Sequence, residues 1–276
     1  GARIQVRNTV LTGNRAYYYG GAIGAALTSG QVQNCLFTDN VSDGADGGAV
    51  YLRGKVGSGA EVSNCTLARN HCLPFLTRGS VLFLEGGATA QIRNTIFYDN
   101  NDVAIAEYDT ASRVTVESCL FYANAQGDLR RAGRQYVVTD PAFGDLTGGG
   151  NTNFSADPMF ARGRLGNYYL SNWNAGQILD VNGLPAVGDS PDPNIAGINP
   201  GSKAADANSP AIDAGSGPAS DLGMDQVSTR TDNGSDTGRV DIGFHYNDPE
   251  ENQTYLLILT ASPSGKSHTM CRNRVP

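Results

Sequence analysis

A nine-residue pattern that recurs five times constrains the fold of this chain more than any other feature. Each copy opens on a β-branched residue and carries Asn, or once Ser, at its third position. The copies begin at Val6, Val32, Val62, Ile92 and Val116, so successive starts lie 26, 30, 30 and 24 residues apart. A unit of this length cannot bury its own apolar face, and repeated units therefore have to stack on one another. The pattern predicts a solenoid.

If each copy belongs to one coil of a parallel β-helix, equivalent residues lie above one another about 4.8 Å apart. The third positions then form a column whose amides can bond from coil to coil and hold a turn in the left-handed region that Asn tolerates. Its members are Asn8, Asn34, Asn64 and Asn94, and Ser118 ends it. We therefore expect an asparagine ladder at this position.

Two neighbouring columns are expected to face inward. The column of small side chains consists of Thr9, Cys35, Cys65, Thr95 and Cys119, and the column of large ones of Leu11, Phe37, Leu67, Phe97 and Phe121. A free Cys packs as a small hydrophobe, which suits the first column. Cys35 and Cys65 fall on adjacent coils, so a disulfide between them is the alternative. Cys72 and Cys271 lie outside the column.

A further column, formed by Val10, Leu36, Ile96 and Leu120, should point outward although it is apolar. Alternation along a strand turns every second side chain to the opposite face, so these residues cannot share the interior with their neighbours. Something must cover them. Our hypothesis is that part of the C-terminal region packs there.

Glycine pairs precede a second strand in the predicted coils, at Gly20-Gly21, Gly47-Gly48 and Gly86-Gly87. Glycine suits a sharp corner with positive φ. The combination of these pairs with the Asn-Cys-x-Phe and Asp-Asn elements of the repeat resembles the right-handed parallel β-helix proteins of bacterial surfaces, including the polymorphic outer-membrane type repeats. The resemblance covers residues 1–124 and implies an all-β fold, a right-handed parallel β-helix with an irregular C-terminal cap.

After residue 124 the periodicity stops, and three short elements follow in order. They are Asp157–Phe160, Ser209–Gly215 and Asp241–Tyr246. Their order is similar to the closing region of secreted bacterial β-helix proteins that end in an anchor-associated segment. The resemblance implies that residues 125–246 form the final irregular coils and a cap, and that residues 247–276 form a linker and the start of a further β module or tail. It also implies a secreted or cell-surface protein whose export signal precedes residue 1.

Composition and charge exclude several partners. The chain carries a formal net charge of −7 and its arginines are scattered, which argues against nucleic acid. No run of about 18 apolar residues is present, so no helical membrane span is expected. With 35 Gly and 12 Pro among 276 residues, the composition favours tight turns over long helices. We expect a monomer.

One repeat position offers candidate catalytic residues, namely Asp39, Arg69 and Asp99. On successive coils the two aspartates would lie about 9.6 Å apart, near the upper end of the range for an inverting glycosidase. The alternative is an ordinary surface charge ladder in which Arg69 lowers both aspartate pKa values and leaves no acid to donate a proton.

Exposed tyrosines are the second candidate feature, because flat rings on a rigid ladder can stack on sugars. The candidates are Tyr17, Tyr18, Tyr19, Tyr98 and Tyr122. The alternative is that half of them only cover the cap junction. Oxygen ligands also gather at Asp232, Asp236 and Asp241, where a structural Ca²⁺ is possible although the spacing lacks the twelve-residue calcium loop.

These features favour an extracellular or cell-surface protein that binds a polysaccharide or cell-surface glycan through its long face. The alternative is a polysaccharide-degrading glycoside hydrolase or lyase on the same scaffold, which rests on fold analogy. A carboxylate pair with shifted pKa values would distinguish the second interpretation from the first.

Overall fold

The computed structural model describes residues 2–44, 46–73, 79–163, 165–172 and 208–247. The chain divides into two compact units, with residues 1–155 in the first and residues 156–254 in the second. The boundary therefore lies after Ser155, whereas the loss of periodicity suggested a change of structure after residue 124. Apart from Asn247, the predicted tail lies outside the described residues, and so does Cys271.

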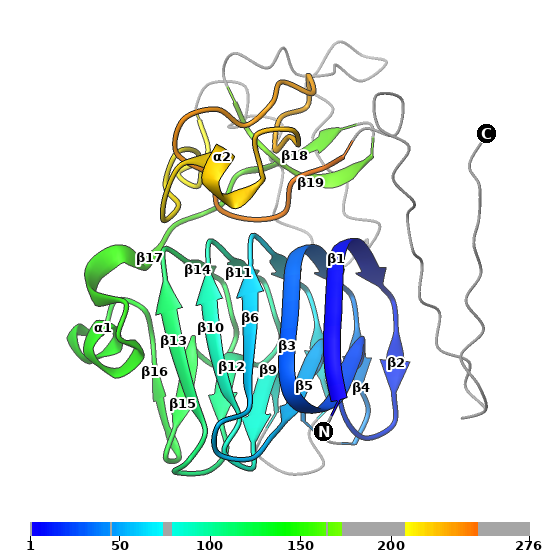
Figure 1. The fold of residues 1–276 in the computed structure, drawn as a ribbon, viewed down its shortest axis with the longest axis vertical. Helices are drawn as coiled ribbons and strands as arrows, with labels where there is room; N and C mark the ends of the chain where they lie inside the picture. Colours follow the sequence, from blue (N-terminus) through cyan, green and yellow to red (C-terminus); the bar gives the residue numbers. More distant parts are fainter. Residues whose placement is uncertain (1, 45, 74–78, 164, 173–207, 248–276) are drawn as a thin grey trace. The chain divides into compact units, whose positions relative to one another are not determined.

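The first unit is a solenoid of stacked coils whose strands pair in parallel, as the repeat predicts (Figure 1). One stack consists of β1 (Ala2–Thr12), β3 (Ile23–Thr38), β6 (Gly59–Ser63), β10 (Thr89–Arg93) and β13 (Arg113–Glu117), followed along the coil by β7 (Thr66–Ala68), β11 (Ile96–Tyr98), β14 (Leu120–Tyr122) and β17 (Phe154–Ser155). Val6, Val32, Val62, Ile92 and Val116 lie in register across it.

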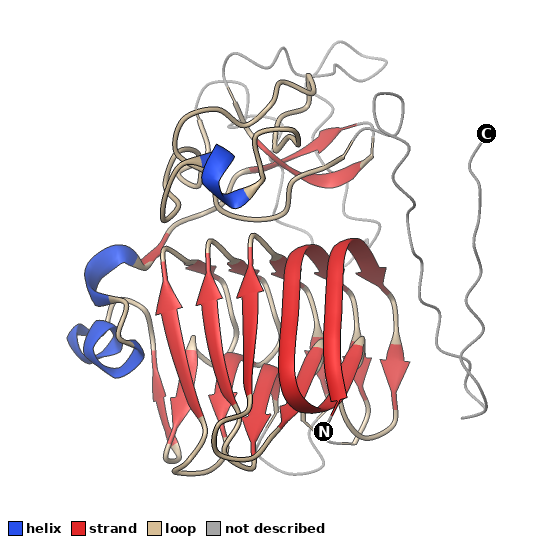
Figure 2. Ribbon diagram, in the orientation of Figure 1, coloured by secondary structure: helices blue, strands red, loops and turns tan. Residues whose placement is uncertain are grey.

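Two further stacks complete the coils (Figure 2). The second contains β3, β5 (Val50–Arg53), β9 (Ser80–Glu85), β12 (Val103–Glu107), β15 (Leu129–Arg131) and the antiparallel β16 (Arg134–Tyr136). The third contains the short strands β2 (Arg15–Ala16), β4 (Val41–Ser42) and β8 (His71–Cys72). The β-helix thus has three faces, each made of equivalent strands from successive coils.

The two predicted inward columns form the core of this unit. Leu11, Phe37, Leu67, Phe97 and Phe121 are all buried, and the rings of Phe97 and Phe121 stack at 5.0 Å between centroids. The small column is buried too, and Cys35, Cys65, Cys72 and Cys119 are free thiols. Cys35 and Cys65 therefore pack in the core as free thiols and do not form the disulfide that was considered as the alternative. Burial raises the pKa of the Cys119 thiol to about 12.

The predicted asparagine column has the expected backbone but only part of the expected bonding. Its residues adopt left-handed φ values of 49–52°. Asn34 Nδ2 donates to Asn8 Oδ1 at 3.0 Å, but both amide atoms of Asn64 are buried with no hydrogen-bond partner. The ladder therefore does not run through Asn64, because this amide makes no bond to the coils on either side.

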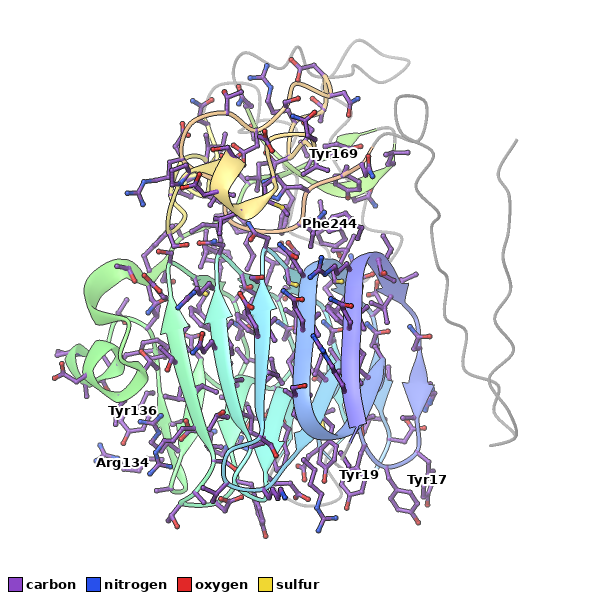
Figure 3. The ribbon with its side chains drawn as sticks, viewed as in Figure 1. Tyr17, Tyr19, Arg134, Tyr136, Tyr169 and Phe244 are labelled. Atoms are coloured by element: carbon purple, nitrogen blue, oxygen red, sulfur yellow. The ribbon has the colours of Figure 1, made fainter. Side chains whose placement is uncertain are left out.

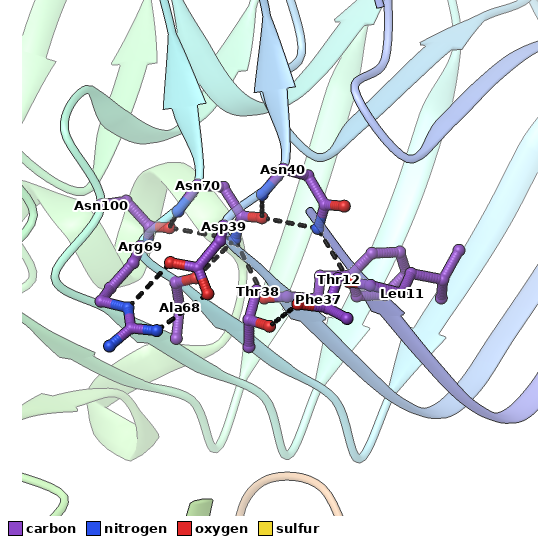
Figure 4. Close-up of polar contacts among 10 residues, drawn as sticks. All are labelled: Leu11, Thr12, Phe37, Thr38, Asp39, Asn40, Ala68, Arg69, Asn70 and Asn100. Atoms are coloured by element: carbon purple, nitrogen blue, oxygen red, sulfur yellow. Dashed lines mark hydrogen bonds and ion pairs between the residues drawn. The ribbon is translucent and has the colours of Figure 1, made fainter. Parts of the chain in front are cut away.

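A continuous ladder instead occupies the ninth position of the repeat, with Asn14, Asn40, Asn70, Asn100 and Asn124 as its members. Figure 4 shows its central part, at Asn40, Asn70 and Asn100. Neighbouring amides bond at 2.8–3.2 Å, from Nδ2 on one coil to Oδ1 on the next. From the second coil onward the same Nδ2 groups also donate to a backbone carbonyl of the preceding coil. Asn40, Asn70 and Asn100 thus each link three coils.

The C-terminal end of the solenoid is closed within residues 129–152. The β15–β16 hairpin ends the second stack, and helix α1 (Pro141–Thr147) places Phe143 in the core, edge-on to Phe121 at 5.6 Å. Asp140 caps α1 through the backbone N–H of Ala142 at 2.9 Å, and the short 3₁₀ helix η1 (Gly150–Thr152) follows. This first unit therefore supplies its own cap.

The second unit brings the three closing elements of the sequence together. The Ser209 hydroxyl donates to Pro158 O at 2.6 Å, the Ile242 N–H to Ala211 O at 2.8 Å, and the Tyr168 N–H to the Tyr246 hydroxyl at 3.0 Å. The unit also contains the hairpin of β18 (Phe160–Gly163) and β19 (Gly166–Leu170) and the helix α2 (Ala219–Leu222). The three elements thus pack together within this unit.

The larger side chains of the outward apolar column are buried. Leu36 is 4% exposed, and Ile96 and Leu120 are fully buried. Their neighbours along the strands, such as Phe37 and Phe97, lie in the solenoid core, so these side chains point to the opposite face. Which segment covers them stays a prediction.

Candidate functional site

Three consecutive tyrosines project from the solenoid between β2 and β3. Tyr17, Tyr18 and Tyr19 are 67%, 61% and 49% exposed. The rings of Tyr17 and Tyr18 meet edge-on at 4.6 Å, and Figure 3 shows Tyr17 and Tyr19 at one border of the unit. The segment ends at Gly20, where φ is 65° and an added Cβ would lie 2.0 Å from Ile23 O. Glycine is therefore required for the turn that presents these rings.

A stack of rings continues from Tyr19 across the next coils. Tyr19 stacks on Tyr51 at 4.4 Å, Tyr51 on Phe83 at 5.9 Å, and Phe83 packs against Tyr108 at 5.8 Å. Tyr51 and Phe83 are 6% and 1% exposed, whereas Tyr108 is 48% exposed. The buried pair thus supports exposed rings at both ends of the stack.

Sequence reasoning missed Tyr51 and Phe83 because it aligned the wrong glycines. The backbone N–H of Gly48 donates to Ser80 O, so the counterpart of the Gly47-Gly48 corner is Gly79-Ser80. Gly86-Gly87 instead follows β9 and packs over Gly54. The signal that identifies the stack is the register of β5 and β9, which pairs Tyr51 with Phe83.

Polar groups flank the stack on the same face. The Tyr51 hydroxyl donates to Glu85 Oε1 at 2.5 Å, and Arg53 Nε lies 3.3 Å from the same oxygen. Burial, followed by the bond to Glu85, raises the pKa of Tyr51 above its usual range. The hydroxyl therefore stays a donor, while the Arg53 side chain remains 66% exposed.

The other two predicted tyrosines lie elsewhere, on β11 and β14. Tyr98 and Tyr122 are in register and stack at 6.3 Å. Tyr98 is only 7% exposed, so its ring face is not available to a sugar, and Tyr122 is 37% exposed. The five predicted residues thus form two groups, of which Tyr17–Tyr19 is the more exposed.

Asp39, Arg69 and Asp99 come together at one corner of the coils, as predicted. Each directly follows a strand of the β3–β7–β11 stack and adopts a left-handed φ of 49–56°. Arg69 Nε and Nη2 bond the two carboxylate oxygens of Asp39 at 3.0 and 2.8 Å (Figure 4). Of the two aspartates, Asp39 is therefore the one that forms the bidentate ion pair with Arg69.

Asp99 differs from Asp39 in its surroundings. Among the residues that the structure describes, its carboxyl group has no hydrogen-bond or ion-pair partner. Its pKa is raised because burial outweighs the opposing charges of Arg69 and His71. Arg69 does act to lower the pKa of Asp99, as expected, but burial of this carboxyl group is the larger effect and the net shift is upward.

Two of the three predicted calcium ligands are neighbours, because Asp236 Oδ2 accepts the backbone N–H of Asp241 at 2.9 Å. Asp232 is bonded to Arg230 at 2.6 Å, whereas Asp236 contacts His245 and Asp241 accepts the Thr229 hydroxyl. In the described part of the chain no three His, Cys, Asp or Glu side chains are grouped as metal ligands. Each of the three carboxylates has a protein partner of its own.

Comparison with known protein families gives a match that covers most of the solenoid. The profile of the family described as right handed beta helix region matches residues 1–142, just over half of the chain. The chain belongs to this family. It is thus a right-handed parallel β-helix protein, which confirms the predicted fold class. No curated protein and no solved structure matches the chain significantly. No helix within the described ranges is long and apolar enough to cross a membrane.

Proposed function

We propose that this right-handed β-helix protein binds a polysaccharide or cell-surface glycan through the tyrosine surface, defined as Tyr17, Tyr18, Tyr19 and Tyr108. A secreted or cell-surface location is part of the proposal. The observation that carries it is the exposure of four rings at the two ends of a stack whose middle, Tyr51 and Phe83, is buried.

The arrangement suits a sugar ligand for two reasons. A tyrosine offers a flat apolar face for the C–H surface of a sugar ring and a hydroxyl for its polar edge. Because Tyr19 already packs on Tyr51 at 4.4 Å, little side-chain freedom remains to be lost on binding. The exposed Arg53 and the Glu85 carboxylate add hydrogen-bonding groups beside the rings.

The test is retention of the whole chain on a panel of immobilised neutral and acidic polysaccharides. Replacing Tyr17, Tyr18 and Tyr19 together by Ala should weaken binding to the retained glycan at least about tenfold, since each aromatic contact of this kind contributes about 0.5–1.5 kcal/mol. Tyr122→Ala, on a different face, is the matched control and should bind as the wild type does. Equal losses in both variants, or none in the triple variant, would remove the proposal.

A second candidate function, polysaccharide hydrolysis, is favoured by the contrast between Asp39 and Asp99. Two carboxyl groups whose environments differ are the pattern of an acid and base pair. Asp99, whose pKa is raised, would give its proton to the glycosidic oxygen, and Asp39 would take a proton from the attacking water. The C–O bond to the leaving sugar breaks as water bonds to the anomeric carbon. The register separation of about 9.6 Å leaves room for that water.

The hydrolytic candidate is tested with the same polysaccharides, by assay of new reducing ends and of absorbance from unsaturated products. Hydrolysis predicts reducing ends without absorbance, and loss of product in Asp99→Asn with glycan retention intact. Reducing ends together with absorbance would indicate a lyase instead. A folded wild-type chain that retains a glycan and releases no product would leave binding as the sole function.

A further inference from the structure

An exposed arginine lies beside the ring stack, on the same face of the solenoid. Arg53 follows Tyr51 by two positions on β5, so both side chains leave the strand on one side. Its register partner on β9 is Glu85, and the backbone N–H of Tyr108 bonds Leu84 O from the next coil. Arg53, Glu85 and Tyr108 therefore form one outward column, in which Arg53 and Tyr108 lie two coil steps, about 9.6 Å, apart.

The ring stack positions this arginine through Glu85. Arg53 Nε lies 3.3 Å from Glu85 Oε1, which also accepts the Tyr51 hydroxyl at 2.5 Å. Within the described ranges, neither Nη1 nor Nη2 of Arg53 has a hydrogen-bond or ion-pair partner, and the side chain is 66% exposed. The outer edge of the guanidinium, with its N–H donors, is therefore open to a ligand.

The neighbouring carboxylate on the next coil is used by the protein itself. Asp109 accepts the backbone N–H groups of Gly86, Ala111 and Ser112 and the Ser112 hydroxyl, at 2.6–3.0 Å. A second cation, by contrast, lies two positions after Arg53: Lys55 is exposed and forms no ion pair with any residue that the structure describes. Beside the rings, the groups left for a ligand are thus mainly positively charged donors.

We propose that the ligand of the tyrosine surface is an acidic glycan, and that Arg53 binds its carboxylate or sulfate groups and determines the preference for it. The inference rests on the proposed function, because it names the class of glycan that the same surface binds. Carboxylate and sulfate groups present several acceptor oxygens, which suit the planar fork of N–H donors on a guanidinium.

The overall charge of the protein makes this local contact decisive. With a formal net charge of −7, the chain as a whole repels an acidic polymer. A preference for acidic over neutral glycans therefore needs a cation at the binding surface, and Arg53 is held there by the same network that supports the rings.

The experiment measures retention of the whole chain on two matched pairs of immobilised polysaccharides. The first pair is polygalacturonate and its carboxyl-reduced, neutral form, and the second is dextran sulfate and unmodified dextran. The wild-type chain should bind the acidic member of at least one pair about tenfold or more tightly than the neutral member, as loss of a charge-assisted contact implies. The two pairs distinguish a carboxylate ligand from a sulfate ligand.

Variants assign the preference to one side chain. Arg53→Gln should weaken binding of the acidic polymer about tenfold or more and leave binding of the neutral one unchanged. Arg7→Gln removes the same charge from an exposed arginine on β1, in the first stack, and is the matched control that should keep the preference. Circular dichroism checks that both variants are folded.

The variant in which Tyr17, Tyr18 and Tyr19 are all replaced by Ala separates this inference from the proposed function. If that variant loses binding while Arg53→Gln keeps the acidic preference, the tyrosine surface stands and the acidic assignment is overturned. Equal losses in Arg53→Gln and Arg7→Gln, equal binding of acidic and neutral members, or no binding to either acidic polymer would overturn it as well. A triple variant that binds as the wild type does would remove the tyrosine surface itself.

Discussion

Replacing Asn70 by Ala should strongly destabilise the solenoid, because this side chain lies in the middle of the continuous ladder. Asn70 is completely buried, and its Oδ1 accepts both the backbone N–H and the Nδ2 of Asn40, at 3.1 and 2.9 Å. Its Nδ2 donates to Phe37 O at 3.0 Å and to Asn100 Oδ1 at 3.2 Å. The substitution therefore leaves the backbone N–H of Asn40 and one of the two Nδ2 hydrogens of Asn40 without an acceptor, while the other Nδ2 hydrogen keeps its bond to Leu11 O.

The expected loss follows from those two donors. A buried polar group left without a partner costs about 1–3 kcal/mol, which gives about 2–6 kcal/mol for the pair. That is a large part of the roughly 5–15 kcal/mol that stabilises a folded domain. Urea unfolding followed by far-UV circular dichroism measures the loss, and hydrogen exchange of peptides from residues 32–72 assigns it to the solenoid.

Gln91→Ala is the matched control, because Gln91 is an exposed amide on β10 of the same solenoid. Its effect should stay within about 0.5 kcal/mol. If Asn70→Ala lowers the free energy of unfolding by less than about 1 kcal/mol, the ladder does not stabilise the coils in the way that its hydrogen bonds indicate.

Three further predictions concern the solenoid. Arg131→Met should cost about 3–5 kcal/mol in urea unfolding, because Glu107 is buried and bonded to Arg131, and adding Glu107→Leu should recover part of the loss. Cys119 should resist alkylation in the folded protein at neutral pH, since burial raises its pKa to about 12; rapid native labelling followed by mass spectrometry would contradict this. Burial alone would raise the pKa of Asp109, but the N–H groups of Ala111 and Ser112 lower it. Its contribution is therefore lost as pH falls below about 3.9. Hydrogen-exchange protection of residues 109–112, corrected for intrinsic rates, should fall in acid, and should fall less in Asp109→Ala.

The repeat predicted the fold and the core because stacking depends on features visible in the sequence. A period near 26–30 residues with a fixed Asn leaves few ways to bury an apolar face, so the inward columns at Phe37 and Phe97 follow directly. The continuous ladder was also present in the sequence, at the ninth position of each copy. Identifying these residues as the ladder requires the backbone geometry of the turn. Asn70 Nδ2 bonds a backbone carbonyl of the preceding coil as well as the amide of the next coil.

The candidate sites were harder to predict because they depend on register and burial. Tyr51 and Phe83 are neighbours only in the observed register of β5 and β9. That register is not evident from the sequence, because the glycine pair Gly86-Gly87 follows β9 instead of preceding it. Likewise, residue type alone does not reveal that Arg69 binds Asp39 while Asp99 is half-buried and keeps a raised pKa. Tyr98 was expected on the surface, and its burial depends on tertiary packing that a repeat pattern does not encode.

The most direct test of the account is a footprint of the bound glycan on the intact chain. Hydrogen exchange, or nuclear magnetic resonance of labelled tyrosines, compares the protein alone with the protein saturated by the glycan that retains it. The perturbations should gather at Tyr17, Tyr18, Tyr19 and Tyr108, and the corner that holds Asp39 and Asp99 should be affected only if the protein also cleaves the glycan. A footprint on another face that leaves these four tyrosines unchanged would contradict the proposed binding surface.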